Sequence, residues 1–100
     1  MFARVSIYEV PAERVGAAAE TFGQAIGQIR EMTGLAAAYL LVNAENGRTL
    51  TMTLWDSRAA MEASRVTASR LRSEAARGLD GDVLSTEEYE VAARELGDAA

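Results

Sequence analysis

The sequence contains no cysteine and no histidine among its 100 residues. Without cysteine there is no disulfide framework, no zinc ribbon and no thiol nucleophile. Without histidine the chain also lacks the most common general base, the most common metal ligand and the usual haem ligand. These two absences exclude most metal centres and many nucleophilic enzymes, and they predict a protein that uses no metal and no other cofactor.

Basic residues and long apolar runs are also scarce. Ten basic residues stand against fifteen acidic ones, for a net charge of -5, so the composition does not attract the phosphates of nucleic acid or an anionic membrane. No stretch approaches the roughly 20 apolar residues of a membrane span, and Arg4 and Glu9 interrupt any signal-peptide pattern. We therefore expect a cytoplasmic protein with neither nucleic acid nor a membrane as its partner.

Hydrophobic residues, in contrast, make up 49% of the chain, which argues against disorder. One hundred residues is the length of one small domain, so we expect residues 1–100 to form a single domain. A chain of this length builds only a limited core by itself. A second copy of the chain would help to bury its apolar surface.

The first part of the chain reads as strand, helix and strand. The β-rich run 3–10 ends at a proline and predicts a first strand. Apolar residues then recur at helical spacing over 12–32, and Gly34 supplies the left-handed position that ends such a helix. The expected inner stripe consists of Val15, Ala19, Phe22, Ile26 and Ile29. The apolar run 35–43 predicts the second strand.

A hairpin and a second helix follow. The Asn-Gly dipeptide at 46–47 is among the strongest hairpin signals, because both residue types accept the positive φ of a tight primed turn. Residues 48–55 are then the returning strand. Asp56 or Ser57 can cap a helix over about 58–77. The inner stripe of this helix is thin and consists of Met61, Ser64, Ala68, Leu71 and Ala75.

The last segment, 82–96, fits two secondary structures. Ser85 and Glu88 suit a capping box that begins a helix, whereas the run YEV at 89–91 alternates like a strand. Because a sheet that covers two helices needs a fourth strand, we place a strand at about 85–92. The resulting order, β-α-β-β-α-β, predicts an α+β fold of the ferredoxin-like type with an antiparallel four-stranded sheet.

The strand TLTMTLWDS, the small-residue helix RAAMEAS and the ending EEYEV resemble the dimeric α/β-barrel superfamily, in particular its antibiotic-biosynthesis-monooxygenase (ABM) branch. The resemblance spans about residues 3–93. It implies a homodimer whose two sheets face each other as a barrel. It also implies a pocket for a small-molecule substrate or ligand between sheet and helices in each subunit.

The activities known in this superfamily narrow the expectation. Haem-degrading members use a Trp and a His ligand in the second helix, where this sequence has Ser64 and Glu74, so we expect no haem degradation. Members similar to anthrone oxygenases carry a Trp at the end of the third strand, an Asn four residues earlier and a Tyr early in the second helix. Trp55 occupies the first of these positions, whereas Thr51 and Met61 replace the other two.

Trp55 and Thr51 are the catalytic candidates. An indole is neither acid nor base at neutral pH, so Trp55 would hold an aromatic substrate and donate a hydrogen bond to a developing oxyanion. The alternative, which we favour, is that Trp55 only fills the strand-helix junction. Thr51 and Thr53 share its strand face, and the resemblance assigns Ser6 and Tyr8 to the same pocket. The substrate-binding candidates are Ser6, Tyr8, Thr53, Met61 and Ser64.

The charged residues of the second helix show no common stripe. They are Arg58, Arg65, Arg70, Arg72 and Arg77, and we expect them to form a solvated face balanced by Glu62 and Glu74. We also expect the acid pair at 87–88 to be solvated.

Two functional hypotheses follow. The first is a cofactor-independent monooxygenase, in which an aromatic or quinol-like substrate reduces dioxygen once it is deprotonated. The proton would leave to a Glu, a Tyr, water or through the substrate's own acidity. The second is a non-catalytic small-molecule-binding or stress-responsive dimer. A Glu or Tyr with a perturbed pKa in the pocket would favour the enzyme, whereas a pocket closed by Trp55 and Met61 without polar groups would favour the second hypothesis.

Overall fold

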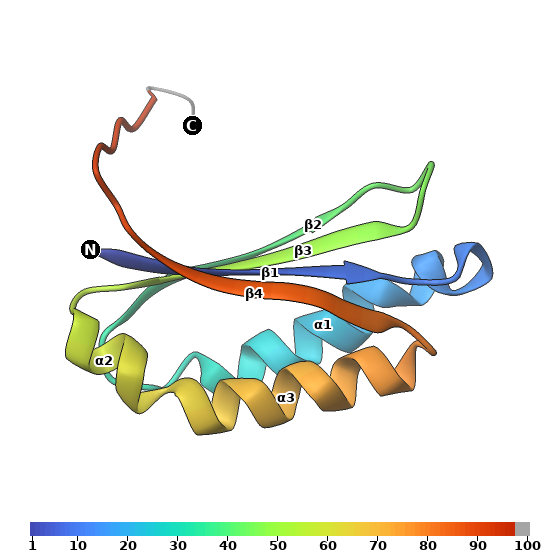
Figure 1. The fold of residues 1–100 in the computed structure, drawn as a ribbon, viewed down its shortest axis with the longest axis horizontal. Helices are drawn as coiled ribbons and strands as arrows, with labels where there is room; N and C mark the ends of the chain where they lie inside the picture. Colours follow the sequence, from blue (N-terminus) through green and yellow to red (C-terminus); the bar gives the residue numbers. More distant parts are fainter. Residues whose placement is uncertain (98–100) are drawn as a thin grey trace.

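A computed structural model of the protein describes residues 1–97 (Figure 1). Its elements follow the chain in the order β1 (Phe2–Glu9), a short 3-10 helix η1 (Ala12–Arg14), α1 (Val15–Ile29), β2 (Leu35–Val42), β3 (Arg48–Trp55), α2 (Arg58–Ala63), α3 (Arg65–Gly78) and β4 (Asp82–Glu90). Apart from η1 and the division of the second helix, this is the predicted β-α-β-β-α-β order. The ferredoxin-like α+β fold class is therefore confirmed.

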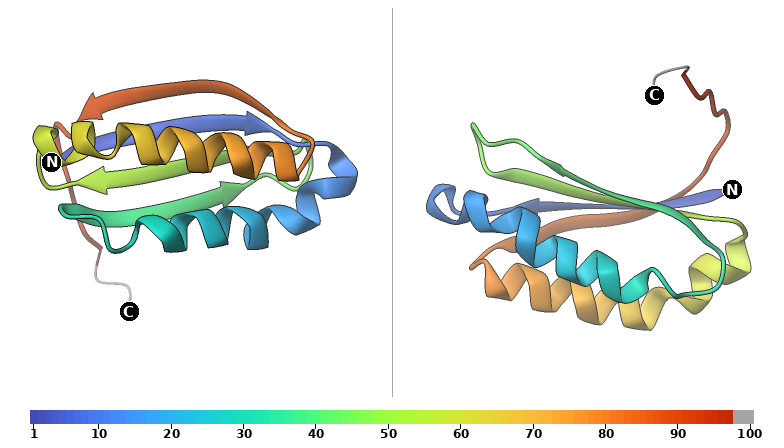
Figure 2. Two further views of the ribbon diagram at one scale, coloured as in Figure 1. Left: turned by 90° about the horizontal axis from the view of Figure 1, so that it is seen from below. Right: turned by 180° about the vertical axis from the view of Figure 1, so that it is seen from behind.

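The strands form one antiparallel sheet, and the helices lie on one of its faces (Figure 1). The strand order is β2-β3-β1-β4, so that β1 is an inner strand that pairs with both β3 and β4. Figure 2 shows α1 and α3 side by side across this face. In the part of the chain that the structure describes, no helix is both long enough and apolar enough to span a lipid bilayer.

The β2-β3 hairpin has a wider turn than predicted. Gly47 adopts a φ of 75°, but Asn46 does not have a positive φ, so the prediction of a two-residue primed turn is wrong. Instead, the Asn43 N–H donates to the Arg48 carbonyl at 2.8 Å, and the Gly47 N–H donates to the Asn43 carbonyl at 2.9 Å. A Cβ at Gly47 would lie 2.3 Å from the Val10 carbonyl oxygen. The hairpin itself is confirmed, and its glycine is required both by φ and by space.

The inner face of α1 differs from the predicted stripe at one position. Ala18, Phe22 and Ile29 are buried, whereas Ala19, which was predicted to face inward, is exposed. Two adjacent alanines carry equal apolar signals, so spacing alone does not tell which one packs. The helix also ends at Ile29, earlier than the predicted Met32.

The second helix is divided at Ser64 into α2 and α3, where the sequence predicted one continuous helix. Ser57 is the cap, and its hydroxyl accepts from the Ala60 N–H at 3.1 Å. The Ser64 hydroxyl donates to the Met61 carbonyl at 2.6 Å and thereby competes with the regular helical hydrogen bonds. The predicted inner stripe is correct, since its members are buried or half-buried.

Residues 82–90 form a strand, so the helical alternative for this segment is wrong. The strand begins and ends earlier than the predicted 85–92, and its register with β1 shifts between Ile7 and Tyr8. The capping box does not form, because the Glu88 carboxylate binds Arg4 instead. Pairing with a distant strand thus decides a conformation that the local signals left open.

The core lies between the sheet and the helices. The Tyr8 and Phe22 rings pack with their centroids 4.6 Å apart. The main cluster of buried residues consists of Tyr8, Val10, Ala18, Phe22, Ala75, Ala76 and Leu79. Trp55 is fully buried at the other end of the sheet, where β3 leads into α2.

The face of the sheet opposite the helices is largely apolar. Its register places Val5, Met52 and Tyr39 side by side on β1, β3 and β2. Tyr39 points away from the helices and is 54% exposed, and Leu41 on the same face of β2 is 51% exposed. No element of residues 1–97 covers this face (Figures 1 and 2). We refer to it below as the open face.

Candidate functional site

A partly open pocket of about 50 Å³ lies between the sheet and the two long helices. Its strand side is polar, and its helix side is mostly apolar. The strand residues in the wall are Arg4, Ser6, Tyr8, Thr51 and Thr53. The helix residues in the wall are Phe22, Ala25, Ile26, Ile29, Ala68, Leu71 and Arg72. A small apolar site with a few convergent polar groups is the usual form of a small-molecule site.

Strand alternation places the hydroxyl groups on one face. Residues i and i+2 of a strand point to the same side, so Ser6 and Tyr8 of β1 and Thr51 and Thr53 of β3 all point toward the helices. The register pairs Ser6 with Thr51 across the two strands. The Ser6 hydroxyl also lies 3.1 Å from the Thr86 hydroxyl of β4. Three strands thus contribute hydroxyl groups to this side of the sheet.

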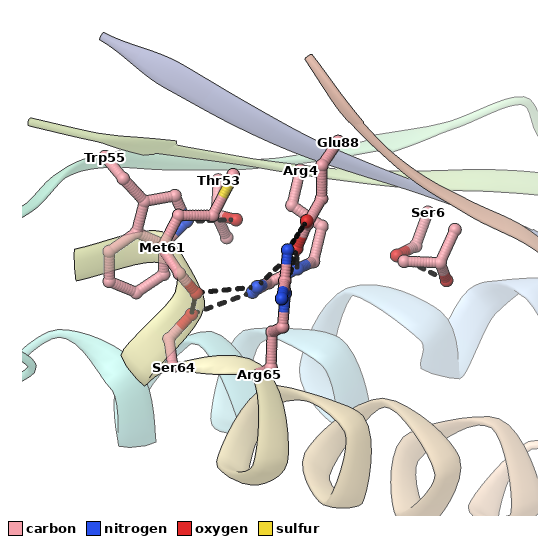
Figure 3. A network of polar contacts seen from close by, with 9 residues as sticks. Arg4, Ser6, Thr53, Trp55, Met61, Ser64, Arg65 and Glu88 are labelled. Carbon is pink, nitrogen blue, oxygen red and sulfur yellow. Dashed lines mark hydrogen bonds and ion pairs between the residues drawn. The ribbon is translucent and has the colours of Figure 1, made fainter. Parts of the chain in front are cut away.

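Two further hydrogen bonds orient the β3 hydroxyls. Tyr8 Oη lies 3.1 Å from Thr51 Oγ1. Trp55 Nε1 donates to Thr53 Oγ1 at 2.9 Å, so the indole fixes a wall residue from behind (Figure 3). Since a hydroxyl has one donor and two acceptor positions, these side chains retain hydrogen-bonding capacity for a ligand.

Tyr8 is the titratable phenol of the pocket. Burial raises its pKa, and hydrogen bonds to the Thr51 and Ser6 hydroxyls together with the positive charge of Arg72 oppose this rise. The phenol is therefore neutral at pH 7. It acts as a hydrogen-bond donor or acceptor and not as an anionic base.

A polar cluster is centred on Arg4, which is one of the residues in the pocket wall (Figure 3). The Arg4 side chain is only 5% exposed, and its Nη2 lies 2.9 Å from Glu88 Oε2. Nη1 donates to Ser64 Oγ at 3.0 Å, and Nη2 donates to the Met61 carbonyl at 2.9 Å. The guanidinium carbon lies 6.0 Å from the Trp55 ring centroid. Arg4 thus joins β1 to β4 and to the α2-α3 junction.

Glu88 is shared between two arginines. Arg65 binds both of its carboxylate oxygens, with Nε donating to Oε2 at 3.2 Å. The hydrogen bonds from Arg65 and Arg4, with their positive charges, lower the Glu88 pKa to about 2 against an opposing effect of burial. The carboxylate stays ionised, and its oxygens are occupied. Glu88 is therefore a structural anion and not a general base.

Arg72 reaches the same pocket from α3 and is half-buried there. Burial lowers its pKa, and the nearby charge of Arg4 acts in the same direction. The pocket wall contains no carboxylate. In residues 1–97, moreover, no group of three or more Asp or Glu side chains is arranged to hold a metal ion.

The family model described as antibiotic biosynthesis monooxygenase (ABM) matches residues 1–76 of this sequence. The chain belongs to the ABM family. This confirms the resemblance that the strand TLTMTLWDS and its neighbouring helix indicated.

Several solved structures share the whole fold. A protein from Deinococcus radiodurans, described as an antibiotic biosynthesis monooxygenase, has a TM-score of 0.77 at 18% identity, covering 97% of this chain and 100% of that one. NE2512 from Nitrosomonas europaea, of unknown function, has a TM-score of 0.71 at 18% identity over 98% and 95%. SnoaB from Streptomyces nogalater, a cofactor-independent oxygenase, has a TM-score of 0.69 at 13% identity over 98% and 97%.

No curated protein matches this ABM-family sequence. At such low identity, the solved structures show that the fold is shared. The activity has to be argued from the pocket.

The predicted site residues divide into two groups. Four of them lie in the pocket wall, namely Ser6, Tyr8, Thr51 and Thr53. The other three are fully buried behind the wall, namely Trp55, Met61 and Ser64. The second group is joined to the wall by hydrogen bonds. Trp55 donates to Thr53, and Met61 and Ser64 accept from Arg4.

Sequence reasoning missed the charged residues of the site. Arg4 stands two residues before Ser6, so strand alternation already pointed to it. Arg72 follows Ala68 by four residues and precedes Ala75 by three, which is the spacing of the predicted inner stripe. Its assignment to a solvated face was wrong. The same correction applies to the Glu88 carboxylate, which no local pattern connects with Arg4.

Proposed function

We propose that this ABM-family protein is a cofactor-independent monooxygenase that acts on a small aromatic or quinol-like compound in the pocket between sheet and helices. The observation that carries the proposal is the row of Ser6, Tyr8, Thr51 and Thr53 hydroxyls opposite an apolar helix wall. Such a pocket holds a flat apolar ring and offers hydrogen bonds to its oxygen substituents. The oxygenase described among the proteins of the same fold supports it.

The proposed reaction needs no external reductant. A carbon acid activated by an aromatic ring loses a proton, and the resulting anion gives an electron to dioxygen. Recombination forms a C–O bond, and the peroxide takes up the proton. Loss of water then breaks the O–O bond and leaves a carbonyl group, so all electrons that reduce dioxygen come from the substrate.

The chain's own residues supply desolvation and hydrogen bonds in this reaction. Thr51 and Tyr8, whose hydroxyls lie 3.1 Å apart, can donate to the oxygen on which negative charge develops. Trp55 acts through Thr53, which it holds in place, because the indole itself is fully buried. The proton leaves through the substrate's own acidity and water, since the pocket wall contains no carboxylate and Glu88, which binds the wall residue Arg4, is held by two arginines.

Ligand entry requires the helix side to move. A cavity of about 150 Å³ accommodates benzene, whereas this pocket measures about 50 Å³. The strand side is held by the hydrogen-bonded sheet. The apolar side chains of Ile26, Ile29 and Leu71 are therefore the groups that have to shift for a ring to enter.

A non-catalytic binding protein is the alternative function. The small volume and the absence of a free carboxylate in the wall favour it. The polar wall and the raised pKa of Tyr8 favour the enzyme. Oxygen consumption discriminates the two, because a binding protein saturates with ligand without consuming dioxygen.

We further propose that two copies of the chain form a homodimer through their open faces. The exposed Tyr39 and Leu41 and the neighbouring Val5 and Met52 make this face apolar over three strands. Contact between two such faces buries them both, which a chain of this size requires for a sufficient core.

The test is oxygen uptake with a panel that runs from small hydroquinones to anthrones. We expect saturable uptake by the wild type and a loss of about tenfold or more in Thr51→Val, because a donor to the developing oxyanion is removed. Ser73→Ala on the exposed surface of α3 is the control and retains full activity. Saturable binding without uptake would select the binding protein, and undiminished uptake in Thr51→Val would remove Thr51 from the reaction.

A further inference from the structure

Arg72 differs from the other arginines near it in having no carboxylate partner. Arg4 and Arg65 bind Glu88, and Arg70 binds Glu74 in the next turn of α3. Within residues 1–97, Arg72 forms no ion pair. Its side chain nevertheless lies half-buried in the pocket wall and not in open solvent.

The charges around the pocket leave a local excess of positive charge. The wall contains Arg4 and Arg72 and no acidic residue, although the whole chain carries a net charge of -5. Glu88 of β4 is close enough for its charge to act on Arg72, but its carboxylate is bound by Arg4 and Arg65. The wall residues contributed by α1 and β3 are uncharged. Arg72 is therefore the cation of the pocket that remains to be neutralised.

Because Arg72 is half-buried, its unpaired charge is unfavourable in free energy when the pocket holds no ligand. A guanidinium that loses water without gaining a counter-ion loses solvation free energy, and the lowered pKa of Arg72 has the same cause. An anion in the pocket restores the balance. The planar guanidinium binds the paired oxygens of a carboxylate or a single phenolate or enolate oxygen through charge-assisted hydrogen bonds.

We propose that the pocket binds its ligand as an oxyanion, with Arg72 as the counter-ion and the Tyr8 hydroxyl as a second donor. The ligand class is an aromatic compound with an acidic oxygen group, either a phenol or enol that ionises on binding or a ring that carries a carboxylate. The binding statement stands by itself, and its catalytic consequence rests on the monooxygenase proposed above.

In this assignment, the positive charge of Arg72 replaces the basic side chain that the pocket wall lacks. A positive charge at the substrate oxygen favours the conjugate base and lowers the pKa of the bound compound by about one unit or more. Proton loss to water then becomes easier without a basic side chain. Arg72 is a catalytic residue in this scheme, because its guanidinium touches the oxyanion of the reacting molecule.

The first experiment uses 4-nitrophenol, whose phenolate absorbs visible light, as a probe of ionisation. Titrating the wild-type protein into the probe below its free pKa should raise the phenolate absorbance and show a bound pKa lowered by about one unit, which is about tenfold tighter binding of the anion. Arg72→Gln should abolish this increase. Arg70→Gln, which removes the same charge from the exposed side of α3, should retain it.

The second experiment distinguishes the two sources of the oxyanion. Benzoate and benzamide have nearly the same shape but differ in charge, and binding of each is measured by calorimetry. Preference for benzoate that is lost in Arg72→Gln, without an effect on 4-nitrophenol, assigns Arg72 to a carboxylate. The converse result assigns it to the phenolate.

Arg72→Lys controls for folding, because it keeps the charge and should keep most of the preference for anions. Thermal unfolding of each variant shows that the fold is intact. The inference would be overturned if the wild type and Arg72→Gln bound 4-nitrophenolate and benzoate equally well. It would also be overturned if the wild type bound neither of these anions. If Arg72→Gln lost anion binding but the wild type consumed no dioxygen with any compound, the inference about Arg72 would stand and the proposed monooxygenase activity would be wrong.

Discussion

Two buried or half-buried arginines of the site have different roles because their partners differ. The Arg4 guanidinium is neutralised by Glu88 and also donates to the Met61 carbonyl and the Ser64 hydroxyl. A buried cation is tolerated when its charge and its donors are satisfied in this way. Arg4 is therefore part of the framework, whereas Arg72 is available for a ligand.

The Glu88 pKa predicts how acid affects stability. The folded-state value of about 2 lies below the ordinary value of 4.5, so the ion pairs stabilise the fold above about pH 4.5. This stabilisation is lost as pH falls from there toward 2. Its size is about 2 kcal/mol after allowance for screening at the exposed Arg65. Denaturant unfolding measured from pH 7 to pH 2 should show this decrease in the free energy of unfolding.

Glu88→Gln should lower stability at pH 7 by about 2 kcal/mol and flatten the acid dependence, since Arg4 loses its counter-ion. Glu20→Gln on α1 is the matched control, because its side chain is exposed, lies away from the open face and forms none of the described ion pairs. If Glu88→Gln and the wild type lost stability in parallel between pH 5 and pH 2, the acid dependence would originate elsewhere.

At the scale of elements, the turn that leads from α1 to β2 contacts the start of α2. Gly34 adopts a φ of 85°, and its carbonyl accepts from the Asp56 N–H at 2.8 Å. A Cβ at this position would lie 2.4 Å from the Ala60 Cβ. The two helical connections are thus held together at a position where only glycine fits.

Gly34→Ala should therefore lower the free energy of unfolding by about 2 kcal/mol, from the strained φ and from overpacking against Ala60. Gly23→Ala in α1 is the contrasting variant. A Cβ at Gly23 would meet no other part of the fold within 4 Å, so alanine should stabilise the helix by roughly 0.5–1 kcal/mol. Urea unfolding compares both variants with the wild type, and equal stability of Gly34→Ala would mean that the turn can move away from α2.

Local sequence signals account for most of the elements but not for the polar cluster. Three short-range patterns show this. Alternation over 48–55 predicted β3, the Asn-Gly dipeptide predicted the hairpin but not its turn type, and the inner stripe predicted a second helix that is divided at Ser64. The last strand was decided only by the need of the sheet for a partner. The Arg4-Glu88 pair joins residues 84 positions apart, so no local pattern indicates it.

The pocket was predictable on its strand side and less so on its helix side. Residues two apart on β1 and β3 necessarily share a face, which located the hydroxyls. Arg72 was missed because a charged residue on a helix is usually solvated. The helical spacing of Arg72 with Ala68 and Ala75 indicates the inner face, but its charge was interpreted as a sign of exposure.

At the scale of the whole molecule, the open face is the surface through which we propose that two copies of the chain associate. We expect light scattering at micromolar concentration to give about twice the 10.7 kDa mass of the chain. Leu41→Arg, which places a charge on the open face, should yield monomers. Val66→Arg is the control, because Val66 is 84% exposed on α3 and the substitution should leave the dimer intact. A wild-type mass near 10.7 kDa would contradict the dimer.

The position of β1 inside the sheet also has a consequence for the order in which the protein forms. β1 precedes the other described strands in the chain, and it takes its partners from residues 48–55 and 82–90. Only the β2-β3 hairpin can form early from neighbouring residues, since contacts of long sequence separation close slowly. The nascent chain therefore completes the described sheet only when β4 has emerged, and until then β1 offers an edge to which other chains can add.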